Sequence, residues 1–389
     1  MTLLRFEFIK VFRKPYVVVS FLLLTLINFA TIFITNKGYQ QWVMEEEQNL
    51  ACTEFLCGPI DKQKIDRVIS ETKRLSEIVA SQEFSREFDP ETRTGYLFSD
   101  FNLYYGYLEP NLKYAVSYAY DIQDVLQRAE ENIRFYELVG NTKNLNENQD
   151  IVRLYAGRSI DEYRNLYGAR YLLFYDFSSL LIIFLLIVTL SPSFVSEKEN
   201  RMDQLFPTFP SGERKINSTK LSFIILITII YCVWFFVMDL IGFALFSHLQ
   251  GFSMPLYSIQ EFRLTPLTLS IIQYYGVNLI FKILGMLLVA FFVSIHSKFL
   301  PKIVYVFLGS ILPLVLFVVW QPRTRSTLDW LDYINPMLLI KNRYLFLSYH
   351  PVFIGPYPIQ PMVPAILTAI IMILLSSIVI QAKIRTRTT

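Results

Sequence analysis

Three ionisable side chains lie inside long apolar segments, where a charged group needs either an ion partner or a functional role. They are Asp176, Asp239 and Lys282. A charged group near the centre of a membrane-spanning helix costs about 2.5–3.5 kcal/mol, so such groups usually pair with one another or face a cavity. We expect Lys282 to pair with Asp239 or Asp176 and so to fix helix packing. A role in binding cargo or in ion coupling is the alternative.

The cysteines and histidines suggest little further chemistry. Cys52 and Cys57 are close in sequence, and outside a cell such a pair is expected to form a local disulfide, with free thiols as the alternative. The histidines stand singly, at His248, His296 and His350. Because a metal site needs several ligands close together, none is expected here.

Catalytic signatures are missing from the sequence. It contains no G-x-x-x-x-G-K-[ST] phosphate loop, no H-E-x-x-H and no G-x-S-x-G. We therefore expect that the chain is not an enzyme and holds no cofactor of its own.

The composition is that of a membrane protein. Of 389 residues, 53% are hydrophobic and only 18% are charged, against about 25% charged in an ordinary globular domain. This balance argues against a soluble enzyme and against a disordered chain. Six segments approach or exceed the roughly 20 apolar residues that cross a bilayer. They are 16–35, 171–192, 221–247, 271–296, 302–320 and 362–382.

Charge asymmetry sets the expected orientation. Residues 37–170 hold 23 acidic and 16 basic side chains, whereas basic residues flank the apolar segments. Positive flanks mark the cytoplasmic side, so both termini are expected there, in a multi-pass protein of the bacterial cytoplasmic membrane. No basic stripe of a nucleic-acid reader is visible. Four cations disagree, because they fall on the outer side: Arg323, Arg325, Lys341 and Arg343.

The predicted fold is an all-α membrane protein with six transmembrane helices. Residues 1–36 would form an N-terminal interfacial helix and the first span, and 37–170 a mostly helical extracellular domain between spans one and two. Residues 171–389 would hold the other spans, with a cytoplasmic loop at 193–220 and an external connector at 321–361. Apolar periodicity predicts external helices near 65–79, 112–133 and 151–163. Residues 333–349 are too apolar for a free loop and suggest short re-entrant helices.

The loop at 193–220 is the most informative stretch. On a short helix, one apolar face would be shared by Phe194, Val195, Met202, Leu205 and Phe206, with Glu197 on the opposite side. Such a helix either lies on the membrane surface or docks onto a cytoplasmic partner.

At this point the sequence resembles the permease subunits of type-2 ATP-binding-cassette (ABC) exporters, in the subset with an extracellular domain. The family has a coupling helix after span two, with an apolar residue, a Glu, an apolar pair, a Pro-Ser turn, an Arg and then a Lys. The corresponding residues here are Phe194, Glu197, Leu205-Phe206, Pro210-Ser211, Arg214 and Lys220. Arg201-Met202 stands where the family often has Gly-Thr.

The resemblance implies a function. Separate cytoplasmic ATPase subunits would bind and hydrolyse ATP, and the loop around Glu197 to Phe206 would dock into them. A second permease chain, identical or paralogous, would complete the pathway in the membrane lipid. The cargo would be a peptide, an antibiotic, a lipid or an ion. The alternative is a protein that transports nothing and acts through its extracellular domain, by mechanotransmission or as a peptide-sensing or immunity protein.

Overall fold

The computed structural model describes residues 3–44, 55–81, 101, 104–202, 212–247, 249–320 and 330–382. In these residues the chain is helical almost throughout, with two short antiparallel strand pairs, β1–β2 and β3–β4. The shorter elements, strands and 3₁₀ or π turns included, are β1 (Gly58–Pro59), η1 (Tyr104–Leu108), β2 (Glu162–Tyr163), η4 (Leu256–Ser258), η5 (Gln260–Phe262), η6 (Asp332–Ile334), η7 (Asn342–Leu345), β3 (Val352–Ile354) and β4 (Tyr357–Ile359).

Five helical stretches are long and apolar enough to cross a membrane, so this is a multi-pass membrane protein. They are Pro15–Lys37, Tyr167–Glu199, Arg214–Phe246, Ile271–Phe299 and Met362–Gln381. The sixth predicted segment forms the shorter apolar helix α13 (Ile303–Val319), which contains Pro313. All six predicted segments are therefore helical, and five of them have the length of a span.

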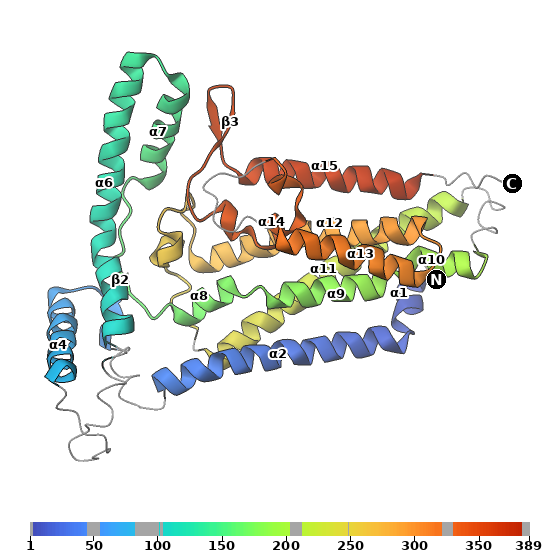
Figure 1. Ribbon diagram of the computed structural model, residues 1–389, viewed down its shortest axis with the longest axis horizontal. Helices are drawn as coiled ribbons and strands as arrows, with labels where there is room; N and C mark the ends of the chain where they lie inside the picture. The colour runs from blue at the N-terminus through green and yellow to red at the C-terminus, as the bar shows by residue number, and fades with distance from the viewer. Residues whose placement is uncertain are drawn as a thin grey trace.

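The long helices pack side by side in one bundle (Figure 1). They are α2 (Pro15–Met44), α9 (Phe177–Leu190), α11 (Gly212–Phe246), α12 (Ile271–Phe299) and α15 (Met362–Gln381). Contact between α2 and α11 is close, since a Cβ on Gly242 would lie 2.9 Å from Ile32. On α2, α13 and α15 many large apolar side chains stay exposed, as expected of surfaces that face lipid.

The second span is built from three consecutive helices: α8 (Tyr167–Phe174), α9 and α10 (Pro192–Glu199). Tyr175 adopts an extended conformation at the first break. Pro192 stands in the first turn of α10, where its missing N–H costs nothing. These breaks let α10 leave the direction of α9 at the same end of the bundle as α1 (Leu3–Phe12) (Figure 1).

A helical module lies beyond the opposite end of the bundle. It consists of α4 (Lys62–Ser81), α6 (Glu109–Val139) and α7 (Thr142–Tyr155), with α6 upright across the bundle end (Figure 1). Gly140, at φ +70°, turns the chain from α6 into α7. The third predicted external helix is misplaced, because α7 ends at Tyr155 and Glu162–Tyr163 pair as a strand with Gly58–Pro59.

Two connectors fold against the bundle at the end that carries the module. Residues 249–270 include η4 and η5. The other connector contains α14 (Pro336–Ile340), whose five residues are all buried, as expected for an apolar re-entrant segment. A Cβ on Gly285 of α12 would lie 3.0 Å from two backbone atoms of α14, the Ile340 nitrogen and the Pro336 oxygen. Glycine is therefore what lets α14 approach this closely.

Candidate functional site

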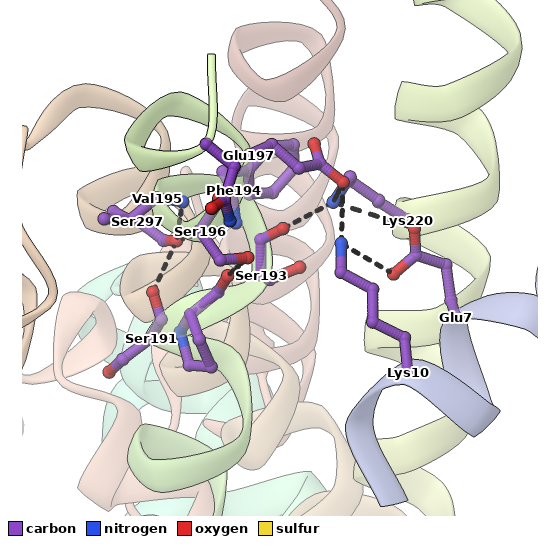
Figure 2. Close-up of polar contacts among 12 residues, drawn as sticks. Glu7, Lys10, Ser191, Ser193, Phe194, Val195, Ser196, Glu197, Lys220 and Ser297 are labelled. Atoms are coloured by element: carbon purple, nitrogen blue, oxygen red, sulfur yellow. Dashed lines mark hydrogen bonds and ion pairs between the residues drawn. The ribbon is translucent and has the colours of Figure 1, made fainter. Parts of the chain in front are cut away.

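Four charged side chains meet where α1, α10 and α11 come together (Figure 2). We call Glu7, Lys10, Glu197 and Lys220 the junction cluster. The Lys10 and Lys220 ammonium groups each lie 2.8 Å from the same Glu197 oxygen. Glu7 lies 3.9 Å from Lys10 and 3.8 Å from Lys220. Positive and negative charges thus alternate around a closed, neutral group.

Burial makes this cluster energetically important. Lys220 is completely buried, and Glu7 and Glu197 are buried as well. Lys220 also donates to the Ser193 carbonyl and lies 4.7 Å from the centre of the Phe194 ring. Removing one partner from a buried ion pair typically costs about 3–5 kcal/mol, because the other charge stays buried without compensation. The cluster therefore holds three helices together as a unit.

Neutral hydrogen bonds fasten the start of α10 to α12. The Ser297 hydroxyl donates to the Ser191 carbonyl at 2.7 Å and accepts from the Phe194 N–H at 3.0 Å (Figure 2). It thereby satisfies a backbone donor in the first turn of α10, which has no partner within the helix.

One residue further along α12, Lys298 binds the end of α15. Its ammonium donates to the Ile380 and Ala382 carbonyls, both at 2.6 Å. A cation is favourable at a helix C-terminus, where carbonyls lack helical partners. Together these contacts join α1, α10, α11, α12 and α15 at one end of the bundle.

Of the residues predicted to dock onto a partner, some are buried in the bundle and one is exposed. Phe194 and Glu197 are both buried, so they do not lie on opposite faces of a free surface helix as we expected. The reason is that α10 packs between its neighbours and uses Glu197 as an internal ion-pair partner. Met202 is 46% exposed. Leu205 and Phe206 lie outside the described residues.

Asp239 has a neutral polar partner. The Asn28 amide donates to its carboxylate at 2.7 Å, and the Tyr175 hydroxyl donates to the Asn28 oxygen at 2.9 Å. Lys282 acts on Asp239 electrostatically, but no ion pair within 4 Å joins them in the part of the chain that the structure describes. The direct Lys282–Asp239 pair that we expected is therefore not formed here.

Asp176 pairs with two of the cations whose outer position contradicted the charge rule. Its carboxylate lies 2.7 Å from Arg343 and 3.5 Å from Lys341. Both cations are largely buried, so they do not act as free loop charges. Lys282 lines the same small cavity as these three residues, without an ion pair to Asp176 among the described residues.

The remaining predicted residues add no metal site in the part of the chain described. No group of three or more His, Cys, Asp or Glu side chains that could hold a metal occurs there. Cys57 lies beside Gln250, while Cys52 and His248 fall outside the described residues. The Cys52–Cys57 disulfide stays a prediction.

The helical module is attached to the 249–270 connector by hydrogen bonds that are buried or partly buried. The Tyr114 and Tyr155 hydroxyls donate to the carbonyls of Tyr257 and Leu264, and Arg158 donates to that of Thr265 at 2.8 Å. Burial raises the pKa of Tyr155 to about 12, so this phenol stays a donor at neutral pH. These attachments link the module directly to the helix pair α11–α12.

Sequence reasoning missed Glu7 and Lys10 as members of the site. A usable signal existed, since an acid and a base three residues apart stand in a mainly apolar N-terminal helix. Their partner, Lys220, was noted only as the residue that opens a span. The pairing of Asp176 with Lys341 and Arg343 gave no such signal, because more than 160 residues separate them.

Comparison of the chain with protein-family models, with curated proteins and with solved structures finds no match in any of the three searches.

Proposed function

We propose that this chain is the membrane-spanning permease subunit of an ATP-driven exporter of the type-2 ABC class. It would have six spans, with α13 as the fifth, and both termini in the cytoplasm. ATP would be bound and hydrolysed by separate ATPase subunits, and the cargo would cross the cytoplasmic membrane in contact with a second permease chain.

The arrangement of the ends supports this topology. Basic residues that flank the spans, Lys10, Lys220 and Lys298 among them, lie at the end of the bundle that holds α1, α10 and the last turn of α15, and the helical module lies at the other end (Figure 1). Two of the four cations that opposed this orientation are not free loop charges, because Lys341 and Arg343 are largely buried and both pair with Asp176. We therefore propose that the α1–α10 end faces the cytoplasm and that the module lies outside.

The junction cluster is the observation that carries the coupling proposal. A partner that pushes on the segment after α10 would move Glu197, and Glu197 is joined by ion pairs to α1 and α11. A displacement of α10 would then move α1 and α11 as well, because Glu197 is ion-paired to both. In this proposal Met202 and the following segment, 203–211, contact the ATPase, while Phe194 and Glu197 transmit the movement from inside.

The experiment is co-purification of the chain with the ABC ATPase encoded nearest to its gene. We expect a complex that hydrolyses ATP, and we expect Met202→Arg to lose the ATPase without losing the folded chain. The matched control is Leu138→Arg, which places the same charge on a side chain that is 89% exposed at the far end of α6. A folded wild-type chain that retains no ATPase would contradict the proposal.

The attachment of the external module supports a second candidate, mechanotransmission without transport. The hydrogen bonds from Tyr114, Tyr155 and Arg158 would carry a movement of α11 and α12 straight into the module. In proteoliposomes containing the complex, this function would give ATP-dependent changes in the module with no accumulation of any peptide, lipid or ion. An exporter would give accumulation that depends on ATP.

A further inference from the structure

A small polar cavity lies where α8, α9, α12 and α14 meet. Its wall includes three cationic side chains, Lys282, Lys341 and Arg343, and a single acid, Asp176. Lys341 and Arg343 both use the Asp176 carboxylate. Lys282 is only 7% exposed and makes no ion pair or hydrogen bond within the described ranges. An ammonium held in this way inside a membrane protein requires an anionic or polar partner.

The neighbouring groups offer donors to the cavity more than acceptors. The Asn342 side-chain oxygen already accepts from the Tyr274 hydroxyl at 3.0 Å. The Asn278 oxygen accepts from the Asn342 amide at 2.8 Å, and Asp176 accepts from Arg343. Lysine and arginine side chains carry only donors. A ligand in this cavity therefore receives hydrogen bonds, which is how an anion binds.

The net charge of the side chains around the cavity indicates the charge of the ligand. Asp239 is a further carboxylate that interacts electrostatically with Lys282, although the two form no ion pair within 4 Å and Asp239 accepts a hydrogen bond from Asn28. Counting both carboxylates against the three cations leaves one excess positive charge. In a low-dielectric interior such an excess is expensive, and one monovalent anion removes it.

The cavity is small, with room for about one small particle, so it favours a small ligand over a bulky one. The side chain of Asp176 is 24% exposed, so the cavity has a route to its surroundings. From these observations we propose that the cavity is a binding site for one monatomic monovalent anion, chloride in physiological solution, held by Lys282, Lys341 and Arg343. This inference does not depend on the exporter function.

The first test is thermal unfolding of the purified chain in detergent at constant ionic strength. We expect potassium chloride and bromide to raise the midpoint by about 2 °C or more over potassium gluconate, with saturation as chloride increases. Equal midpoints in the three salts, or a rise that does not saturate, would overturn the proposal, because a general salt effect does not saturate.

Two substitutions that change the charge balance in opposite directions sharpen the test. Lys282→Met removes the excess charge and should abolish the chloride response. Asp176→Asn increases the excess and should shift the response to at least tenfold lower chloride. Lys113→Met, at an exposed ion pair in the module, is the control and should respond like the wild type. A chloride response that survives Lys282→Met would refute the assignment.

A direct measurement keeps the proposal testable if these variants fail to fold. Crystals of the unmodified chain grown in bromide should give an anomalous scattering peak within hydrogen-bond distance of the Lys282 ammonium. Ordered water at that position, with no anomalous signal, would show that the cavity holds solvent only.

Discussion

Glu197 illustrates how a residue selected for a role at the surface can act from the inside. Its motif position suggested contact with a partner, yet one of its oxygens receives two ammonium groups of its own chain, Lys10 and Lys220. Lys220 is buried completely, so its charge depends on this carboxylate. Glu197 therefore contributes first to the stability of the fold. It can contribute to coupling only through the helices that its ion pairs connect.

Double substitution in the junction cluster should be less harmful than either single one. Glu197→Gln or Lys220→Met leaves a buried charge uncompensated and should cost about 3–5 kcal/mol. The double variant leaves the neutral pair Glu7–Lys10, so its cost should fall well below the sum of the two. Chemical unfolding of the three variants in detergent measures this. Strict additivity would show that the two charges do not interact.

Alkaline pH should destabilise the helical module, which contains Tyr118 on α6 and Tyr155 on α7. Burial raises the pKa of Tyr118 and of Tyr155 to about 12, from 10.0 when unfolded. Because the folded pKa values are raised, this stability is fully present below pH 10 and is lost as pH rises from 10 to about 12. Each phenol should account for about 2 kcal/mol at the end of that window. Tyr118→Phe and Tyr155→Phe should each flatten the decline, measured as unfolding free energy against pH.

At the scale of elements, Gly285 fixes how closely α14 approaches α12. Gly285→Ala places a Cβ 3.0 Å from backbone atoms that cannot move independently, so we expect a loss of about 1–3 kcal/mol. Gly276→Ala on the same helix is the control, because nothing lies within 4 Å of its Cβ, and it should gain up to about 1 kcal/mol. Thermal unfolding distinguishes them. Equal effects would mean that α14 shifts freely.

The apolar helices were predictable and the short elements between them were not. Long, mainly apolar runs such as Ile271–Phe299 favour a helix locally, so their positions followed from the sequence. The strand pair β1–β2 depends on contacts between residues about a hundred positions apart, and periodicity carries no trace of such contacts. For the same reason Asp176 was identified as an intramembrane charge while its partners, Lys341 and Arg343, were missed.

For the whole molecule, the assigned orientation can be measured by thiol labelling in cells. In a background with the native cysteines replaced, Leu138→Cys at the tip of the module should react with a membrane-impermeant reagent. Met202→Cys at the other end should react only after the membrane is opened. Labelling of Met202→Cys in intact cells would reverse the assigned orientation.

Helix α1 has two apolar sides, and this has a mechanical consequence. Phe8 packs edge-on against Phe223 of the bundle at 4.9 Å and stacks on Phe12, whereas Leu3 and Phe6 are exposed. The outer side belongs to the lipid, and the inner side is joined to α10 through Lys10 and Glu197. If a change in the tension or thickness of the leaflet tilts α1, this tilt must either move α10 or break the Lys10–Glu197 ion pair. A mechanical change in the bilayer is therefore transmitted to the same contact between α1 and α10.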